Sequence, residues 1–570
     1  MSVFDRMFRV LCVGALAACG AETSTSLPPA AQTTPAKIEA PGTAQTAQAT
    51  PQQRQSPPAS TQPREIHFPP IARETTGSGL EVNTVSLPGV PVVQVKLVIK
   101  SGSARDPSDL PGTAQLVAEM LKEGTAKHTS AALAESVDFL GAQLGIHNDS
   151  EQITINVRAL AEHLPEALAL VSELATQPTF DEGELAKLKK RELDRLSLMA
   201  QSPNFLARRE FWKQLYGAHP YSHIDTNKDV LKRIKRADLA AFHRRYFAPN
   251  NAYLVVVGDV THSQVMAAAN KSFKGWPTHE LAKLDYPTPP SRNTREIILV
   301  DRPESVQSVI YVGNLALARK DPNYVPLLVA NQVLGGSAAS RMFMDLREKQ
   351  SLTYGAYSDL DEGLVPVPFR AFAAVRNEVT AQALKAFFQH LDRISTEQAS
   401  DAEVSDAKRL LVDSFPLHIE TPSEIAGLVS DLRQYSFPDN YWDGFRAEIQ
   451  AVTPARALEA AKRYITPNTA LVVVVGKAAA VKEALSNYGA VRVIDTDGGL
   501  VAADPVPTAT GTVTPALTPA QPPKPASIAP APKPPVTAPN APATTAPAAP
   551  PQPAQTAPKP ELPKDTKQEN

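Results

Sequence analysis

Alternating apolar and polar residues predict several half-buried strands along the chain. Residues 92–99 alternate in this way, and so do residues 152–157. Between these strands, one apolar face predicts a helix, made by Leu116, Val117, Met120 and Leu121. A charged helix is predicted over residues 180–195, with its lysine and arginine run on a solvated face. Strands and helices that alternate in this way indicate an α+β fold in which helices pack on sheets.

Two stretches of the chain nearly repeat each other. Residues 245–258 and 463–476 share Arg-Tyr, Pro-Asn and an apolar run that ends in glycine, at a constant offset of 218 residues. Upstream, an apolar strand followed by Asp-Pro occurs near residues 92–107 and again near 306–322, at an offset of 215 residues. Two matches in the same order indicate a duplication. We therefore predict two tandem homologous α/β-sandwich units, each a mixed sheet with helices packed on it.

Proline content separates the ends of the chain from its middle. Of 53 prolines, 20 lie in residues 501–570 and 8 in residues 20–64, and neither stretch contains an aromatic residue. Such sequence buries too little apolar surface to offset chain entropy, so we expect disordered tails. The expected segments are a signal peptide at 1–18, a disordered tether at 19–64, a first domain at 65–281, a Pro-rich linker at 282–292, a second domain at 293–499 and a disordered tail at 500–570.

Charge and cysteine content exclude several classes of protein. With 57 Lys+Arg against 59 Asp+Glu, the net charge of −2 gives no electrostatic basis for binding nucleic acid. Two cysteines are too few for a disulfide framework or a multi-cysteine zinc ribbon. No apolar run approaches the roughly 20 residues that a bilayer-spanning helix needs.

The N-terminus has the layout of a bacterial export signal. Arg6 and Arg9 precede a short apolar run, and residues 16–19 read Leu-Ala-Ala-Cys, which resembles the lipobox of bacterial lipoproteins. This resemblance implies that Cys19 is lipidated and becomes the first mature residue, so that the chain is anchored to a membrane on the periplasmic side of the cell envelope. Gly20, in place of the aspartate that signals inner-membrane retention, favours the outer membrane. The alternative is a plain secretory signal with a cysteine near its cleavage site.

Several motifs in the middle of the chain resemble the insulinase, pitrilysin and mitochondrial processing peptidase family, over residues 70–495. The motifs are Gly112-Thr113-Ala114 with Gly124-Thr125, His219-Pro220-Tyr221, the two Arg-Tyr-x-x-Pro-Asn segments, and Leu346-Arg347-Glu348-Lys349. The resemblance implies that the two units form one half of a clamshell that closes on peptides. Active members carry His-x-x-Glu-His in the first segment, where two imidazoles four residues apart bind zinc and the glutamate polarises its water.

The zinc ligands of the family are absent from the matching positions. Aligned without gaps, the motif positions hold Gln115, Ala118 and Glu119, and the third ligand position falls near Arg195. An amide, a lone carboxylate and a guanidinium do not make a tight zinc site, so we expect no cofactor in this chain. The pair His219 and His223 has Pro220 between its members, which argues against a regular helical pair. The ordinary interpretation of Gln115 and Glu119 is a side-chain hydrogen bond on a helix.

The second unit retains an Arg/Tyr pair, Arg347 and Tyr354. In active family members such a pair faces the zinc across the cavity, where both side chains can donate to a substrate carbonyl that becomes an oxyanion. The structural alternative makes Arg347 a surface helix residue near Asp345 and Tyr354 an aromatic residue in the core of a strand.

The resemblance implies a role in a two-chain enzyme. The family includes bacterial pairs in which one chain carries zinc and the other the Arg/Tyr pair, so we expect a non-catalytic subunit with three kinds of partner: a zinc-bearing homologue, a peptide substrate and, through the lipid anchor, a membrane. A second hypothesis is an inactive peptide-binding or scaffold lipoprotein of the cell envelope. A third is an unaided peptidase with an unconventional site built from Glu119 and His128 or His147.

Overall fold

Two six-stranded mixed sheets, one in each half of the chain, form the framework of the protein. The computed structural model describes residues 66–283 and 286–501, which belong to one compact unit. The expectations of a signal peptide, a tether and a C-terminal tail concern residues that lie, apart from 500 and 501, outside this range. The expected α+β class, with two tandem units in which helices pack on a mixed sheet, is confirmed.

The two sheets share the order of their inner strands. In spatial order, the first sheet consists of β1 (Ala72–Thr75), β2 (Glu81–Ser86), β6 (Ala252–Gly258), β3 (Val92–Ile99), β5 (Ile153–Leu160) and β4 (Gln143–Asn148). The second consists of β12 (Ala490–Ile494), β7 (Glu296–Asp301), β11 (Leu471–Gly476), β8 (Gln307–Leu315), β10 (Pro368–Arg376) and β9 (Thr353–Leu360). The sheets differ at one edge, where β1 runs antiparallel to β2 whereas β12 runs parallel to β7.

The repeated sequence stretches occupy equivalent places in the two sheets. The apolar runs that end in glycine form β6 and β11, which lie inside their sheets and are buried along their whole length. Short 3-10 turns, Pro249–Asn251 and Pro467–Thr469, precede these two strands. The alternation pattern found β3 and β5, but β3 is buried on both faces and not half-buried as predicted, because it lies between β6 and β5 inside the sheet. The pattern missed the edge strand β4, none of whose residues is fully buried.

Helices follow the strands in both halves. Those of the first half are α2 (Thr113–Met120), α3 (Ser130–Phe139), α4 (Leu164–Thr176), α5 (Glu182–Met199), α6 (Pro203–Tyr216), α7 (Lys228–Arg233), α8 (Arg236–Tyr246) and α9 (His262–Ser272). Those of the second half are α10 (Tyr324–Leu334), α11 (Arg341–Phe343), α12 (Thr380–Thr396), α13 (Asp401–Ser414), α14 (Pro422–Gln434), α15 (Tyr441–Gln450), α16 (Pro454–Tyr464) and α17 (Ala478–Leu485). None of the described helices is both long enough and apolar enough to cross a membrane.

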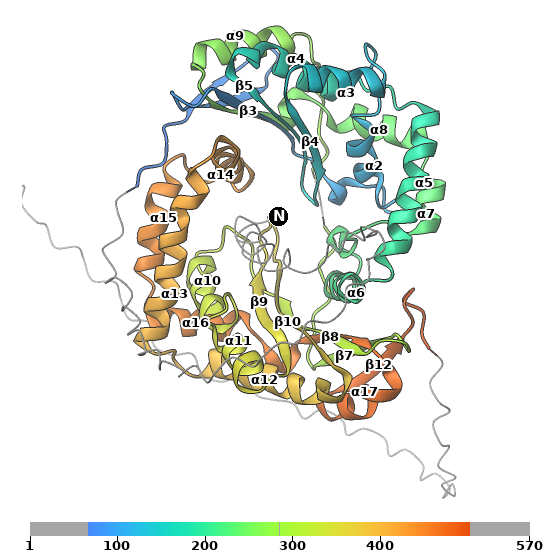
Figure 1. The fold of residues 1–570 in the computed structure, drawn as a ribbon, viewed down its shortest axis with the longest axis vertical. Helices are drawn as coiled ribbons and strands as arrows, with labels where there is room; N and C mark the ends of the chain where they lie inside the picture. The colour runs from blue at the N-terminus through green and yellow to red at the C-terminus, as the bar shows by residue number, and fades with distance from the viewer. Residues whose placement is uncertain (1–65, 284–285, 502–570) are drawn as a thin grey trace, which may run out of the picture. The chain divides into compact units, whose positions relative to one another are not determined.

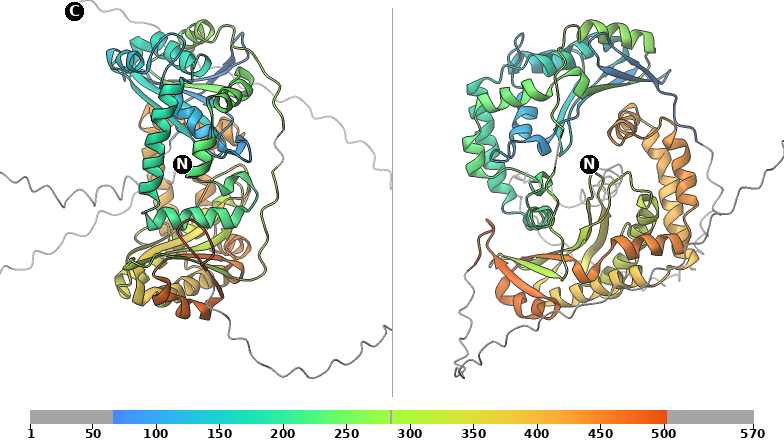
Figure 2. Two further views of the ribbon diagram at one scale, coloured as in Figure 1. Left: turned by 90° about the vertical axis from the view of Figure 1, so that its right-hand side faces the viewer. Right: turned by 180° about the vertical axis from the view of Figure 1, so that it is seen from behind.

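The two halves exchange one helix each. Helix α6 of the first half packs on β8 and β11 of the second sheet, where the Phe211 ring meets the Tyr311 ring at 5.9 Å. Helix α14 of the second half packs on β3 and β6 of the first sheet, where the Tyr253 hydroxyl donates to the Ser430 carbonyl at 3.2 Å. Figures 1 and 2 show α6 beside the second sheet and α14 beside the first. The inner strands of each sheet are therefore covered on both faces, one of them by the other half of the chain.

Candidate functional site

Helix α2 carries the positions that correspond to the zinc motif. The Gln115 side-chain amide donates to the Glu119 carboxylate at 3.4 Å, which confirms the i,i+4 contact expected from the sequence. Lys122 pairs with the same carboxylate at 2.8 Å. Ala118 is only 2% exposed and packs in the core of the first unit. The carboxylate of Glu119 is thus already balanced by a cation, and position 118 offers no polar atom.

Arg195 lies on α5, which packs against α2. Its two terminal nitrogens donate to the two carboxylate oxygens of Asp225, both at 2.8 Å. Its Nε donates to Glu192 at 2.7 Å. These two carboxylates raise the pKa of Arg195 above its usual value. Asp225 lies 30 residues further along the chain, so no local sequence signal pointed to this pairing.

The residues at these positions do not fit a zinc ion. A site for zinc needs imidazole, thiolate or carboxylate ligands with free lone pairs, whereas Glu119 is paired with a lysine and Arg195 presents a cation. Within residues 66–283 and 286–501, no group of three or more His, Cys, Asp or Glu side chains is arranged to hold a metal.

The hypothesis of an unconventional site built on His128 receives no support from its geometry. The Nδ1 of His128 lies 2.7 Å from the carboxylate of Glu173, and the hydroxyl of Thr125 donates to the same oxygen. This carboxylate joins α4 to the loop after α2. His219 lies just before the short 3-10 turn Pro220–Ser222 and not on a helix with His223, as the intervening proline led us to expect.

Arg347 lies in a π-helical turn, Met344–Lys349, that follows α11. The Gln350 amide donates to the Asp345 carbonyl at 2.9 Å, five residues back, and the Leu352 amide donates to the Leu346 carbonyl at 2.8 Å. The Arg347 guanidinium lies 4.9 Å from the centre of the Phe343 ring and remains 47% exposed, with a 3.4 Å ion pair to Glu348. An exposed ion pair of this kind is weak, so the guanidinium remains able to bind another group.

Tyr354 lies on β9, the outer strand of the second sheet, and is 90% exposed. The alternative in which Tyr354 is a core aromatic residue is therefore wrong. Just before β9, Ser351 has a φ of 51°, in the left-handed region that non-glycine residues rarely adopt. The pairing of β9 with β10 also shifts register between Ala373 and Val375, at the end of β9 that carries Tyr354.

Three local irregularities thus flank the Arg/Tyr pair: a π-helical turn, a left-handed serine and a register shift. Each is uncommon and costs free energy, and each type gathers at functional sites. The segment carries two exposed hydrogen-bond donors, the Arg347 guanidinium and the Tyr354 phenol. Such a pair can bind and polarise a carbonyl oxygen.

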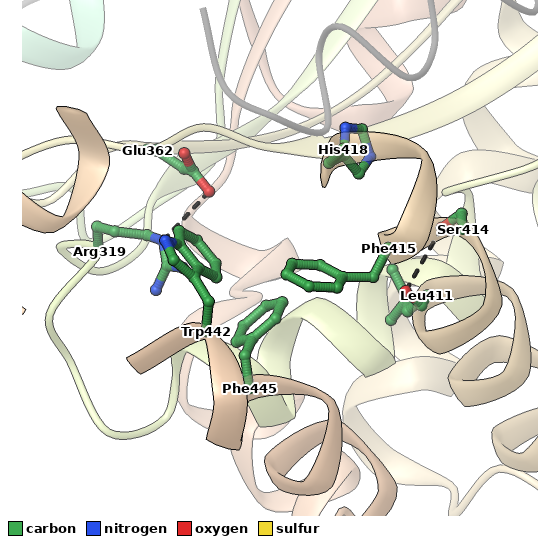
Figure 3. A pocket seen from close by; sticks show the side chains of 8 residues that line it. All are labelled: Arg319, Glu362, Leu411, Ser414, Phe415, His418, Trp442 and Phe445. Carbon is green, nitrogen blue, oxygen red and sulfur yellow. Dashed lines mark hydrogen bonds and ion pairs between the residues drawn. The ribbon is translucent and has the colours of Figure 1, made fainter. Parts of the chain in front are cut away.

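A small enclosed space in the second unit has a structural role instead. It has a volume of about 10 Å³, enough for one water molecule. Figure 3 shows Arg319 and Glu362 on one side of it, joined by an ion pair of 3.2 Å. The Arg319 guanidinium is 3% exposed and lies 4.0 Å from the centre of the Tyr324 ring. This cluster holds loops of the second unit together and has no room for a substrate.

Two family models match the chain. Residues 81–221 match the model described as Insulinase (Peptidase family M16), and residues 233–411 match the model described as Peptidase M16 inactive domain. Together the two matches cover more than half of the chain. The chain belongs to the insulinase family of peptidases.

Two solved structures of proteins resemble this chain. A crystal structure of a peptidase M16 inactive domain from Pseudomonas fluorescens is 28% identical, covers 71% of this chain and 98% of its own, and has a TM-score of 0.67. A protease from Helicobacter pylori, 20% identical with the same TM-score, covers 71% of this chain and 99% of its own, and shows the fold alone.

Among sequence relatives, a protein of Bacillus subtilis named as an uncharacterized zinc protease is 26% identical over 50% of this chain and 69% of its own. A protein of Streptomyces coelicolor with the same description is 24% identical over 67% of this chain and 85% of its own.

Proposed function

We propose that this insulinase-family chain is a non-catalytic subunit of a zinc metallopeptidase. It completes a peptide-binding chamber and supplies Arg347 and Tyr354 to a homologous partner that carries the zinc. The observation that carries this proposal is the contrast between the two parts of the expected site. The zinc positions hold side chains paired with one another or with neighbours, whereas Tyr354 is 90% exposed beside a strained turn.

The chemistry of the pair fits a role in peptide hydrolysis. Zinc in the partner would supply an activated water, and the addition of that water to a peptide carbonyl would place negative charge on the carbonyl oxygen. The Tyr354 hydroxyl and the Arg347 guanidinium can each donate a hydrogen bond to that oxygen, and neither has to release a proton. Losing one such donor typically lowers the rate by about 10²–10³-fold.

The proposal includes a location. Residues 16–19 support lipidation of Cys19 and attachment to the periplasmic side of the cell envelope, at the outer membrane. These residues lie outside the described range. Residues 20–64 would then serve as a tether between the anchor and the folded units.

The test is co-purification of the tagged chain from membranes, followed by peptide hydrolysis with the complex. Arg347→Ala and Tyr354→Ala are each expected to lower the rate by about 10²–10³-fold. Arg463→Ala is the matched control for the first variant, because Arg463 is also exposed and lies over a ring, that of Tyr464, at 5.3 Å. Phe139→Leu is the control for the second, because Phe139 is 88% exposed. An unchanged rate in both site variants would reject the catalytic assignment and favour a scaffold lipoprotein.

A further inference from the structure

A chain of polar side chains connects the π-helical turn to helix α12. The His390 Nε2 lies 2.8 Å from the Asp345 carboxylate, and the Gln350 side-chain amide donates to the same carboxylate oxygen at 3.0 Å. Gln382, two turns before His390 on α12, donates to the Gln350 side chain at 3.2 Å. Asp345 lies near the start of the turn and Gln350 directly after its end. Both ends of the turn are therefore tied to one straight helix.

The protonation of His390 follows from its surroundings. The side chain is 8% exposed, and burial lowers its pKa, with Arg393 and Arg341 acting in the same direction and Asp345 opposing them. A neutral imidazole next to a carboxylate carries its proton on the nitrogen that faces it, here Nε2. The other ring nitrogen, Nδ1, is buried and has no hydrogen-bond partner among the described residues. His390 thus has one hydrogen bond, and that bond goes to Asp345.

Asp345 determines where the π-helical turn closes, because two of its groups accept hydrogen bonds from Gln350. Its carbonyl accepts the Gln350 amide across five residues, and its carboxylate accepts the Gln350 side chain. In an α-helix the residue paired with 345 would be 349, so this π-type closure inserts one extra residue between the two ends. The extra residue rotates the middle of the turn, where Arg347 lies over the Phe343 ring.

We propose that Asp345 and His390 are positioning residues that hold the π-helical turn and thereby aim Arg347 and Tyr354 at the substrate carbonyl. This inference rests on the proposed function of the Arg/Tyr pair. Neither residue touches substrate: His390 is buried on α12, and Asp345 acts through the backbone that carries Arg347. A displacement of about 1 Å at a reacting group can lower a rate by about 10²-fold, so a loosened turn has a measurable effect.

The first experiment measures amide hydrogen exchange in the isolated full-length chain, and needs no partner. His390→Leu removes the donor to Asp345 while keeping a buried side chain. We expect the Gln350 and Leu352 amides to exchange about ten- to a hundred-fold faster, the effect of losing a hydrogen bond to a charged group. His390→Gln places an amide donor near the former Nε2 and is expected to restore slow exchange. Unchanged exchange in His390→Leu, or equal acceleration in both variants, would overturn the proposal.

Glu403→Gln is the matched control for this experiment. Arg341, at the start of α11, donates to the two Glu403 oxygens at 2.6 and 2.9 Å, and this link joins the same segment to α13 without contacting Asp345. The Gln350 and Leu352 amides are expected to keep their exchange rates in Glu403→Gln. Acceleration equal to that of His390→Leu would mean that any weakening of the segment frees the turn, and would overturn the specific role of His390.

The second experiment measures kinetics in the co-purified complex. His390→Leu is expected to lower kcat by about 10–10²-fold with KM unchanged, and His390→Gln to recover most of it. The double variant His390→Leu with Arg347→Ala is expected to lose less than the product of the two single losses, because part of the effect of His390→Leu passes through Arg347. Independent, multiplied losses would overturn the proposal. If Arg347→Ala and Tyr354→Ala both leave the rate unchanged, the proposed function fails, and the exchange experiment still decides whether His390 holds the turn.

Discussion

The two regions in which we predicted catalytic positions from the sequence have opposite characters. In the first, on α2 and α5, the polar side chains pair with neighbours: Gln115 with Glu119, and Arg195 with two carboxylates. In the second, residues 341–354, the backbone leaves regular geometry, and the two polar side chains of interest remain exposed. In the first region the polar side chains serve the structure, whereas in the second region irregular backbone surrounds an exposed tyrosine and an arginine whose ion pair to Glu348 is exposed. Phe180 and Ser436 also have a positive φ, so the strain at Ser351 supports the proposed role only together with the exposure of Tyr354.

The duplication shows that the fold itself does not require the strained turn. Helix α3 of the first unit precedes the outer strand β4, as α11 and the π-helical turn precede the outer strand β9. Helix α3 runs regularly from Ser130 to Phe139 and begins with a hydrogen bond from the Ala132 amide to the Thr129 hydroxyl. A regular helix is thus compatible with the same place in the repeat.

The largest expected effect comes from replacing Arg347 by lysine. Lysine keeps the charge but lacks the planar fork of donors, so Arg347→Lys is expected to lower the hydrolysis rate of the complex by about 10²-fold. The free energy of unfolding should change by less than about 0.5 kcal/mol, since the side chain is exposed. Kinetics of the complex and urea unfolding of the chain measure the two quantities. A rate equal to that of the unsubstituted complex would contradict the role of residues 341–354 in hydrolysis.

An arginine-to-lysine replacement at Arg195, in the first region, is expected to lower the free energy of unfolding and not the rate of hydrolysis. Arg195→Lys loses the paired bonds to Asp225 and the bond to Glu192, two carboxylates whose side chains are only 11% and 12% exposed. We expect the free energy of unfolding to fall by about 2 kcal/mol, less than for a fully buried pair because Arg195 is 36% exposed. Urea unfolding measures this loss, and hydrolysis by the folded complex should stay unchanged. A selective loss of rate would give the first region a catalytic role.

Glu151 tests whether a buried unpaired group behaves differently from an exposed one. Its Oε1 is buried without a hydrogen-bond partner among the described residues, and burial, assisted by Asp149, raises its pKa from 4.5 to about 7. The unfolded chain releases this proton near pH 4.5 and the folded chain only near pH 7, so stability falls as pH rises through this window. Glu151→Gln is therefore expected to stabilise the chain by about 1 to 2 kcal/mol at pH 8 and to change little at pH 4.

Urea unfolding at the two pH values measures the Glu151 effect. Glu135→Gln, at an exposed position on α3, is the matched control and should change stability at neither pH. Equal stabilisation by Glu151→Gln at both pH values would contradict a protonation effect.

The smallest effect is expected at Gln115. Its hydrogen bond to Glu119 spans 3.4 Å on a helix surface, and such pairs contribute about 0.2–0.5 kcal/mol. Gln115→Ala should lower the free energy of unfolding by no more than this amount, measured by urea unfolding, and should leave hydrolysis by the complex unchanged. A large loss of rate would mean that the first region still takes part in catalysis.

The sequence predicted much of the fold because duplication and apolar runs are local signals. The strands β6 and β11 and the contact between Gln115 and Glu119 follow from residues close together in the chain. The exchange of α6 and α14, the pairing of Arg195 with Asp225 and the bond between His390 and Asp345 join residues at least 30 positions apart. The spacing of apolar residues along the chain does not reveal contacts between residues so far apart. The exposure of Tyr354 likewise depends on its place at the end of an edge strand, which the sequence left open.

The most direct test of the central claim measures zinc content and peptide hydrolysis for the purified full-length chain, alone and mixed with a zinc-bearing homologue from the same cell. We expect that this chain alone holds no stoichiometric zinc and cleaves no peptide, and that the mixture is active and loses its activity with Tyr354→Ala. Stoichiometric zinc in this chain, together with peptide hydrolysis in the absence of any partner, would contradict the account.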